Sequence, residues 1–403
     1  MAIRFFHTLL LSVFLASTVT AADTIPHSPL ASGKWVKISA DTSGIYQISA
    51  EELKSWGFES ADKITVYGCG AVAASSHTDI QSDGFCRAAS TVTGDGRLLF
   101  YAEGPVRTGI NPANSSAINY TRSAYDTKSF YFITDSKSPA EIPVRKFSPS
   151  AESINWHYAI ELIENEVQNY GKGGIFFHDR PLAAGQHTDF TYSVRDFYSA
   201  PDAPLCIFKL EAAAKTPNSL NIPIASPEII ERLSSSTNLH IPSSSASNRL
   251  YMPSSNGMVN FRPGNFDGNL LTFSIDIPST FSGSYFAVDK AWLKYPQKLI
   301  FDGENDFFIN LNASDAPRNI RIRGLSATDK IWDITDPAAI TQLELTADGN
   351  DTLASPASET PRIQHHSPAS RRQLHRRSSQ SVVALATNSR TADCMHRRMS
   401  RKC

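Results

Sequence analysis

Short runs of aromatic and β-branched residues, separated by turns, recur along the whole chain without long helical segments between them. Such residues suit a pleated, half-buried strand surface. The clearest runs are 63–67, 97–102, 130–134, 190–194, 205–210, 270–275 and 291–301. Strands in series without regular helices favour a β-sandwich or barrel over a parallel α/β sheet. The sequence therefore predicts a mainly β fold with two sandwich-like or barrel-like domains and few short helices.

The first strands are followed by a helix signal. Runs 35–39 and 45–48 flank a Gly-bearing turn, which predicts a β-hairpin. Ser49 can cap a helix, and Glu52, three residues later, can complete a capping box. Gly57 provides the stop signal. We therefore expect one short helix between Ser49 and Gly57.

Composition indicates the domain boundaries. Pro, Ser and charged residues gather at 138–153, which predicts a linker between a first domain at 33–148 and a second β-rich domain at 154–348. No Phe, Tyr or Trp follows Trp332. Residues 351–403 hold ten Lys and Arg against three Asp and Glu. Such a segment buries too little apolar surface to offset the entropy of ordering, so we expect a disordered basic tail at 351–403. The abrupt change in composition where it begins suggests a reading-frame slip.

The first 22 residues have the features of an export signal. A basic residue, Arg4, precedes the apolar run 9–16, and small residues lead to Ala21 and Ala22. This pattern predicts a secretory signal peptide at 1–22. No later stretch reaches the roughly 18 apolar residues of a transmembrane helix. We therefore expect an exported protein, in the periplasm or at the outer membrane or cell surface, with no transmembrane segment.

Five cysteines are too few for a disulfide scaffold, and none has CxxC spacing. They are Cys69, Cys86, Cys206, Cys394 and Cys403. Two alternatives remain open in the sequence: buried thiols, or one bridge between Cys69 and Cys86, which an exported protein allows.

Two groups of polar residues could form a site. His178 and Asp179 could provide a general base, but such a pair at the end of a run more often marks a polar strand end. Glu161, Glu164 and Glu166 could bind a cation, yet no further carboxylates follow at calcium-loop spacing. We interpret these carboxylates as a solvated charged face.

A Cys–His dyad requires rigid elements that hold both side chains in contact. Cys394 with His375 or His396 lies in the coreless tail, and Cys206 with His187 is better explained by core packing. We therefore predict no catalytic residue, no cofactor-binding residue and no metal ligand in this chain, and no cofactor.

The tail could also gather a metal through His365, His366, His375 and His396, or bind polyanions through its Arg pairs. Solvated disorder is the better interpretation, and we expect no nucleic-acid partner for an exported protein.

Six segments occur in a fixed order at 35–48, 64–70, 98–105, 125–134, 164–177 and 331–337. They include Gly68-Cys69-Gly70 and the Gly104-Pro105 turn. Together they resemble the gingipain-type cysteine peptidases that include the type IX secretion system sortase. The resemblance spans about residues 33–348, which in that family precede the peptidase domain.

This resemblance implies an accessory, non-catalytic N-terminal portion of a sortase. Such an enzyme removes C-terminal sorting signals from cargo and attaches the cargo to anionic lipopolysaccharide. In the family, the catalytic His lies in a Gly-His-Gly-like turn and the Cys follows a later strand, and this chain contains no Gly-His-Gly. The implied partners are the peptidase domain of a full-length protein, other type IX secretion components and cargo proteins.

A non-enzymatic surface module that binds glycan or protein is the alternative. It would use exposed aromatics such as Trp156, Tyr170 or Trp292, arranged as an open groove. The sortase interpretation instead predicts an apolar face left bare for a missing domain.

Overall fold

The computed structural model describes Leu30 and most of residues 32–366. Not described are residues 1–29, 31, 72–85, 112–116, 124–125, 136–140, 170–176, 230–232, 234–236, 244–254, 267, 302–307, 313, 315, 337–338, 357–361 and 367–403. The predicted signal peptide therefore lies outside the described residues. In the described part of the chain, no helix is long and apolar enough to cross a membrane.

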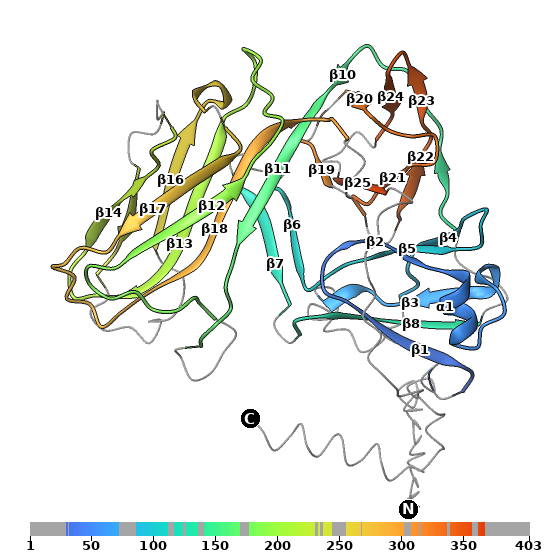
Figure 1. The fold of residues 1–403 in the computed structure, drawn as a ribbon, viewed down its shortest axis with the longest axis horizontal. Helices are drawn as coiled ribbons and strands as arrows, with labels where there is room; N and C mark the ends of the chain where they lie inside the picture. The colour runs from blue at the N-terminus through green and yellow to red at the C-terminus, as the bar shows by residue number, and fades with distance from the viewer. Residues whose placement is uncertain are drawn as a thin grey trace, which may run out of the picture.

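The fold is mainly β, as predicted, and consists of three β units (Figure 1). The first sandwich has one layer in the order β1-β8-β3 and another in the order β2-β5-β4. Its core includes Ile38, Ile48, Phe100 and Tyr131, and the rings of Phe100 and Tyr131 lie 5.8 Å apart across the layers. The bounds are β1 Trp35–Ala40, β2 Gly44–Ile48, β3 Ile64–Tyr67, β4 Ser90–Val92, β5 Leu98–Ala102 and β8 Ser129–Asp135.

The predicted hairpin between the first two strands is wrong. β1 pairs with β8, whereas β2 pairs with β5 in the opposite layer. Ile38 of β1 and Ile48 of β2 enter the same core from opposite sides. The turn between them therefore crosses from one layer to the other, because both strands bury apolar side chains on that core.

The predicted helix is confirmed as α1, Ala50–Ser55. The Ser49 side chain accepts a hydrogen bond from the Glu52 backbone N–H, and the Glu52 carboxylate accepts one from the Ser49 N–H. Gly57 follows with φ of +84°, a left-handed conformation that glycine adopts without strain. Two 3-10 turns are also described, η2 Ala61–Lys63 and η3 Pro263–Asn265.

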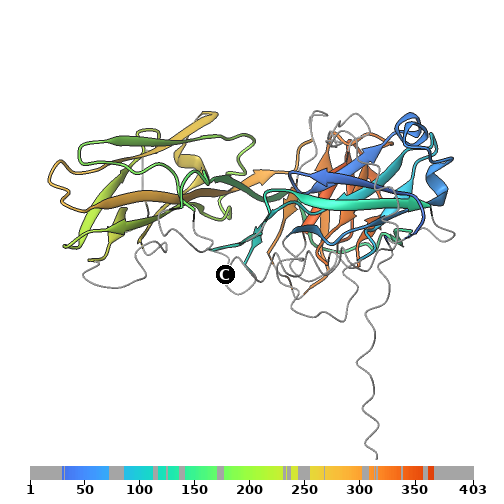
Figure 2. The same ribbon diagram turned by 90° about the horizontal axis from the view of Figure 1, so that it is seen from below.

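A hairpin leaves the first sandwich and reaches the second unit (Figures 1 and 2). It consists of β6, Val106–Ile110, and β7, Ile118–Arg122. Figure 2 shows that the molecule is elongated, with this hairpin between its two halves.

The middle sandwich forms one half of the molecule. Its strands are β11 Trp156–Ile163, β12 His187–Ser193, β13 Cys206–Lys215, β14 Leu220–Ala225, β15 Asn238–Ile241, β16 Ser255–Phe261, β17 Leu270–Asp276 and β18 Tyr285–Lys298. Phe208 of β13 stacks on Phe273 of β17, with ring centroids 3.8 Å apart and an interplanar angle of 4°. Among the described residues, 26 form the buried core around this pair.

The last β unit continues the same sheet through β11, which pairs with both β18 and β19. It has its own core, with Ile309, Ile320 and Ile331 among its buried members. Its strands are β9 Val144–Arg145, β10 Ser153–Ile154, β19 Phe308–Asn310, β20 Asn319–Arg323, β21 Lys330–Asp333, β22 Thr341–Leu343, β23 Thr346–Asp348, β24 Asp351–Ala354 and β25 Arg362–His366. The region expected as one domain at 154–348 thus contains two separate cores.

Two segments expected to lack structure form strands. The linker expected at 138–153 contains β9, which pairs with β22, and the first residue of β10, which pairs with β20. The tail expected from residue 351 begins with β24, and β25 pairs with β19 and β21. β24 (DTLA) and β25 (RIQHH) contain no aromatic and few apolar residues, but their backbones pair with existing strands. Composition misplaced this boundary because it does not report backbone pairing. Residues 367–403 lie outside the described residues.

Cys69 and Cys86 form a disulfide with Cα atoms 5.4 Å apart, which settles the alternative that the sequence left open. Their separation falls within the range of native disulfides. The bridge ties the end of β3 to the segment before β4.

Candidate functional site

The structure does not bring the candidate dyad of Cys206 and His187 together. Cys206 is fully buried in the middle sandwich, and burial raises the pKa of its thiol. The two ring nitrogens of His187 each lie 2.8 Å from a carboxylate, Asp276 on one side and Asp189 on the other. A buried neutral thiol without a histidine partner is not a nucleophile.

Other candidates cannot be placed. Cys394, His375 and His396 lie outside the described residues, and His365 and His366 are described only by their backbone in β25. No group of three or more His, Cys, Asp or Glu that could hold a metal ion occurs among the residues that the structure describes.

The carboxylates after β11 do not form a solvated face. The Glu164 side chain is 5% exposed and forms an ion pair with Arg122 of β7. Tyr120, also on β7, donates a hydrogen bond to Glu164. Glu166 lies 3.6 Å from the Arg122 Nε atom. Burial, together with the nearby charge of Glu164, raises the pKa of Glu166 to about 7.

Further charged groups extend this network into the middle sandwich. Lys290 Nζ lies 2.6 Å from Asp289 and 2.8 Å from Glu211. The same ammonium group lies 4.8 Å from the centre of the Tyr120 ring. We call the set of Tyr120, Arg122, Glu164, Glu166, His178, Glu211, Asp289 and Lys290 the junction cluster. It connects the β6–β7 hairpin to the middle sandwich.

His178 belongs to this cluster rather than to a general base with Asp179. Its Nε2 atom lies 4.0 Å from Asp289, and its side chain is fully buried. Burial lowers the pKa of His178 and raises that of Asp289. Asp179 instead accepts a hydrogen bond from Asn165 at 2.8 Å. The arrangement positions the β6–β7 hairpin against the middle sandwich.

Glu161 lies apart from Glu164 and Glu166, at a small cavity of about 280 Å³. His157 and Arg195 line the same cavity. Burial lowers the pKa of His157 to about 4, whereas Glu161 is an exposed residue of β11. The three glutamates therefore do not form a single cation site.

The aromatic residues named for a binding groove are dispersed. Trp292 is 2% exposed in the core, and Tyr170 lies outside the described residues. Trp156 is half-buried and stacks on Tyr198, with ring centroids 5.7 Å apart. Of the three residues named for the groove, Trp156 is the one that the structure describes as partly exposed.

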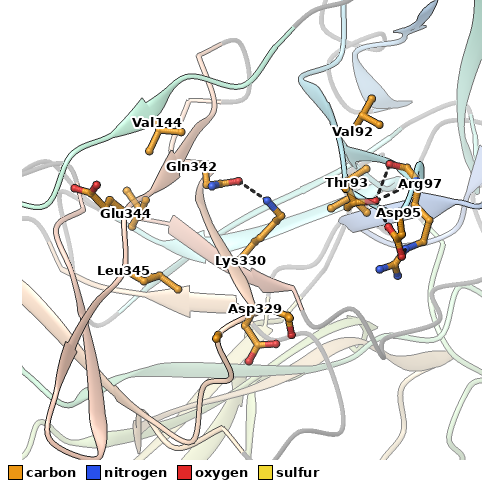
Figure 3. Close-up of a pocket in the computed structure, with 15 residues that line it drawn as sticks. Val92, Thr93, Asp95, Arg97, Val144, Asp329, Lys330, Gln342, Glu344 and Leu345 are labelled. Carbon is orange, nitrogen blue, oxygen red and sulfur yellow. Dashed lines mark hydrogen bonds and ion pairs between the residues drawn. The ribbon is translucent and has the colours of Figure 1, made fainter. Parts of the chain in front are cut away.

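A larger cavity of about 640 Å³ lies between the first sandwich and the last β unit (Figure 3). One wall is the β4–β5 turn, with Val92 and Arg97, and the other carries Val144 and Leu345. Lys330 projects between the walls toward Gln342, with 3.3 Å between its Nζ atom and the amide oxygen. Its volume is typical of a ligand site.

Sequence reasoning missed both the junction cluster and this cavity. Arg122 and Glu164 are 42 residues apart in sequence, and the cavity is lined by three separate segments, 92–99, Val144 and 327–345. The only sequence signal for the cavity was the position of two valines: Val92 precedes a Gly-containing turn, and Val144 lies in a Pro-rich segment.

Neither a protein-family model nor a curated protein matches the sequence. Among solved structures, dimeric latent PorU from Porphyromonas gingivalis aligns with a TM-score of 0.69, at 18% identity, over 86% of this chain. The alignment spans 33% of the PorU chain, so this chain corresponds to about a third of its length. At this identity the likeness shows a shared fold. Wild-type BuGH86 in complex with neoagarooctaose aligns over 66% of this chain at 10% identity with a TM-score of 0.22, which does not indicate a common fold.

Proposed function

We propose that this chain is the accessory N-terminal β portion of a type IX secretion sortase. The observation that carries the proposal is the shared fold with PorU over 86% of the chain. Such an enzyme would remove C-terminal sorting signals from cargo and attach the cargo to anionic lipopolysaccharide. Cys206 is fully buried and His187 contacts two carboxylates, so we assign the chemistry of the proposed enzyme to a peptidase domain that would be the partner of this chain.

The six segments of the family resemblance support the proposal, because the described ones include strands, a tight turn and buried core residues. Segment 98–105 covers β5 and its closing turn, where Gly104 packs against the Thr42–Ser43 backbone. Segment 331–337 begins in β21 with Trp332, which is fully buried. Residues that hold a fold together are the ones that distant relatives with the same fold would share.

The proposed place of the protein is outside the cytoplasm, at the periplasm or outer-membrane surface. The signal peptide expected at 1–22 supports export, and so does the Cys69–Cys86 disulfide, because disulfides persist in oxidising compartments. Other type IX secretion components and cargo proteins are the proposed partners.

The intact mass of the native protein tests whether a peptidase domain accompanies this chain. We expect a species far heavier than 44.2 kDa that yields peptides from residues 33–348 and a Gly-His-Gly segment. A mature species of about 42 kDa, the chain less about 0.11 kDa for each signal-peptide residue, with peptides from 367–403 would contradict the proposal.

Deleting the gene in its own organism tests the activity. The proposal predicts that secreted cargo retains its C-terminal sorting signals, measured by mass spectrometry of culture supernatant and outer membrane. Re-expression of the intact gene should restore cleavage. Normal cargo processing in the deletion strain would exclude a sortase role.

A surface module that binds glycan or protein is the second candidate, supported by the half-buried stack of Trp156 on Tyr198. It predicts retarded migration in gels that contain surface polysaccharide, and loss of the retardation in Trp156→Ala. Leu270→Ala, which removes a 56% exposed apolar side chain of β17, is the matched control. Equal migration of wild type and Trp156→Ala would reject this candidate.

A further inference from the structure

Two sheet edges meet at the 640 Å³ cavity. β4 is the outer strand of the β2-β5-β4 layer, and β9 is the outer strand of the 13-stranded sheet. An edge strand presents backbone N–H and C=O groups that can pair with another extended chain. The cavity is therefore bounded by strands able to accept an additional strand.

The backbone of Val92 points away from its own sheet. Thr93 N–H donates to Arg97 O, and Tyr101 N–H donates to Ala89 O, so residues 89, 91 and 93 pair with β5. Because hydrogen bonding alternates along an antiparallel strand, the N–H and C=O of Val92 face outward. Its side chain is 37% exposed at the cavity wall.

Val144 has the same arrangement on the opposite wall. Gln342 N–H donates to Pro143 O, and Glu344 N–H donates to Arg145 O, which directs the backbone groups of Val144 away from β22. The Val144 side chain is 50% exposed. Val92, Val144 and Leu345 thus provide apolar contacts on both sides of one cavity (Figure 3).

Charge distinguishes this cavity from an ordinary surface groove. Asp95 forms an ion pair with Arg97, and Glu344 forms one with Lys146. Among the described residues, Lys330 has no carboxylate partner and contacts only the neutral Gln342 amide through its ammonium group. A half-buried ammonium without a carboxylate favours an anionic ligand group.

We propose that this cavity binds an extended peptide segment of a partner protein. The segment pairs with the outward-facing backbone of Val92 as an added strand, places small apolar side chains against Val144 and Leu345, and directs a carboxylate to Lys330. Main-chain hydrogen bonds then provide affinity, while the valines and the lysine select the side chains and the carboxylate. The proposal uses only residues of this chain and does not rest on the proposed sortase function.

Fluorescence polarisation with three labelled synthetic peptides tests the site on the full chain. The first alternates valine and threonine and ends in a free carboxylate, the second is its C-terminal amide, and the third has proline at alternate positions. We expect the carboxylate peptide to bind about tenfold more tightly than the amide, and the proline peptide not to bind. Absence of binding by the carboxylate peptide overturns the proposal.

Two variants assign the contacts. Lys330→Gln should weaken binding of the carboxylate peptide about tenfold and leave the amide peptide unchanged. Val92→Pro removes the outward N–H and should abolish binding, whereas the matched control Val92→Thr keeps that N–H and should bind. Thermal melting confirms that each variant is folded. The proposal is overturned if Lys330→Gln binds the carboxylate peptide as tightly as wild type does. It is also overturned if a folded Val92→Pro binds that peptide as tightly as wild type does. Neither outcome depends on the intact mass of the native protein, which tests the sortase proposal.

Discussion

Arg122 and Glu164 hold the β6–β7 hairpin against the middle sandwich, although they belong to different units of the fold. The Glu164 carboxylate is 5% exposed and the Arg122 guanidinium 26% exposed, so solvent screens this pair far less than it screens surface pairs. Lys290 adds a second contact through the face of the Tyr120 ring. A buried carboxylate that loses its cation is left with an uncompensated charge.

Removing the Arg122 side chain should therefore destabilise the protein. We expect Arg122→Ala to lower the free energy of unfolding by about 3 kcal/mol, because Glu164 stays buried without its partner. Urea denaturation followed by tryptophan fluorescence measures the change. Lys63→Ala, which breaks the exposed Lys63–Glu59 pair, is the control and should leave the midpoint unchanged. Equal effects of the two substitutions would mean that the junction pair contributes nothing.

Glu166 should make stability depend on pH. Its pKa is raised from 4.5 to about 7 in the folded protein, so the folded state binds more protons than the unfolded state between these values. Stability therefore falls as pH rises through this window. Glu166→Gln stays neutral, so its stability relative to wild type should increase from pH 4.5 to 7, by at least about 1 kcal/mol, and then level off.

Denaturant titrations of both proteins across pH 4 to 8 measure this difference. The lowered pKa of His178 acts in the opposite direction, and the raised pKa of Asp289 in the same direction. Both groups are present in wild type and variant, so the difference reports Glu166 together with its interactions with Glu164 and Asp289. A difference that does not vary with pH would show that Glu166 is ionised normally.

At the scale of secondary structure, the sequence predicted those helices and strands whose formation depends on residues close together in the chain. The Ser49 and Glu52 capping box is satisfied by residues within one turn, so α1 was predictable. The strand runs were predictable for the same reason, and each coincides with a strand. Pairing was not, because the choice of β8 over β2 as the partner of β1 depends on which layer buries each apolar face.

Gly104 closes β5 where two backbone segments approach closely. A Cβ atom there would lie 2.6 Å from the carbonyl carbon of Thr42 and 2.7 Å from the Ser43 nitrogen. We expect Gly104→Ala to destabilise the protein by about 1–3 kcal/mol, because backbone atoms must move apart. Gly94→Ala, whose Cβ would meet nothing within 4 Å, is the matched control. Thermal melting of the two variants distinguishes them, and equal melting temperatures would contradict the close approach.

At the scale of the whole molecule, composition could not separate the last β unit from the middle sandwich. The sheet runs continuously through β18, β11 and β19, so no linker-like segment marks the boundary between their cores. The cavity also depends on this scale, since β4 and β9 belong to different sheets that only the assembled fold brings together. Neither feature leaves a periodic pattern in the sequence.

A fourth core joins the first sandwich to the last β unit. Trp332 of β21 is fully buried there and belongs to the same cluster as Ile45, Leu99 and Tyr101, which lie on the outer face of the β2-β5-β4 layer. The two units bury apolar surface on each other, so we expect them to unfold together in the wild-type protein.

Trp332→Ala should uncouple the two units. Truncating a buried tryptophan costs about 3–5 kcal/mol, and here the cavity forms between two units that each retain a core of their own. We therefore expect one calorimetric transition in wild type to become two in the variant. Trp156→Ala, which truncates a half-buried ring on the middle sandwich, should leave the coupling intact. A single transition in Trp332→Ala, merely shifted to lower temperature, would show that the units are joined by more than this core, and would identify β9 and its pairing with β22 as the next contact to disrupt.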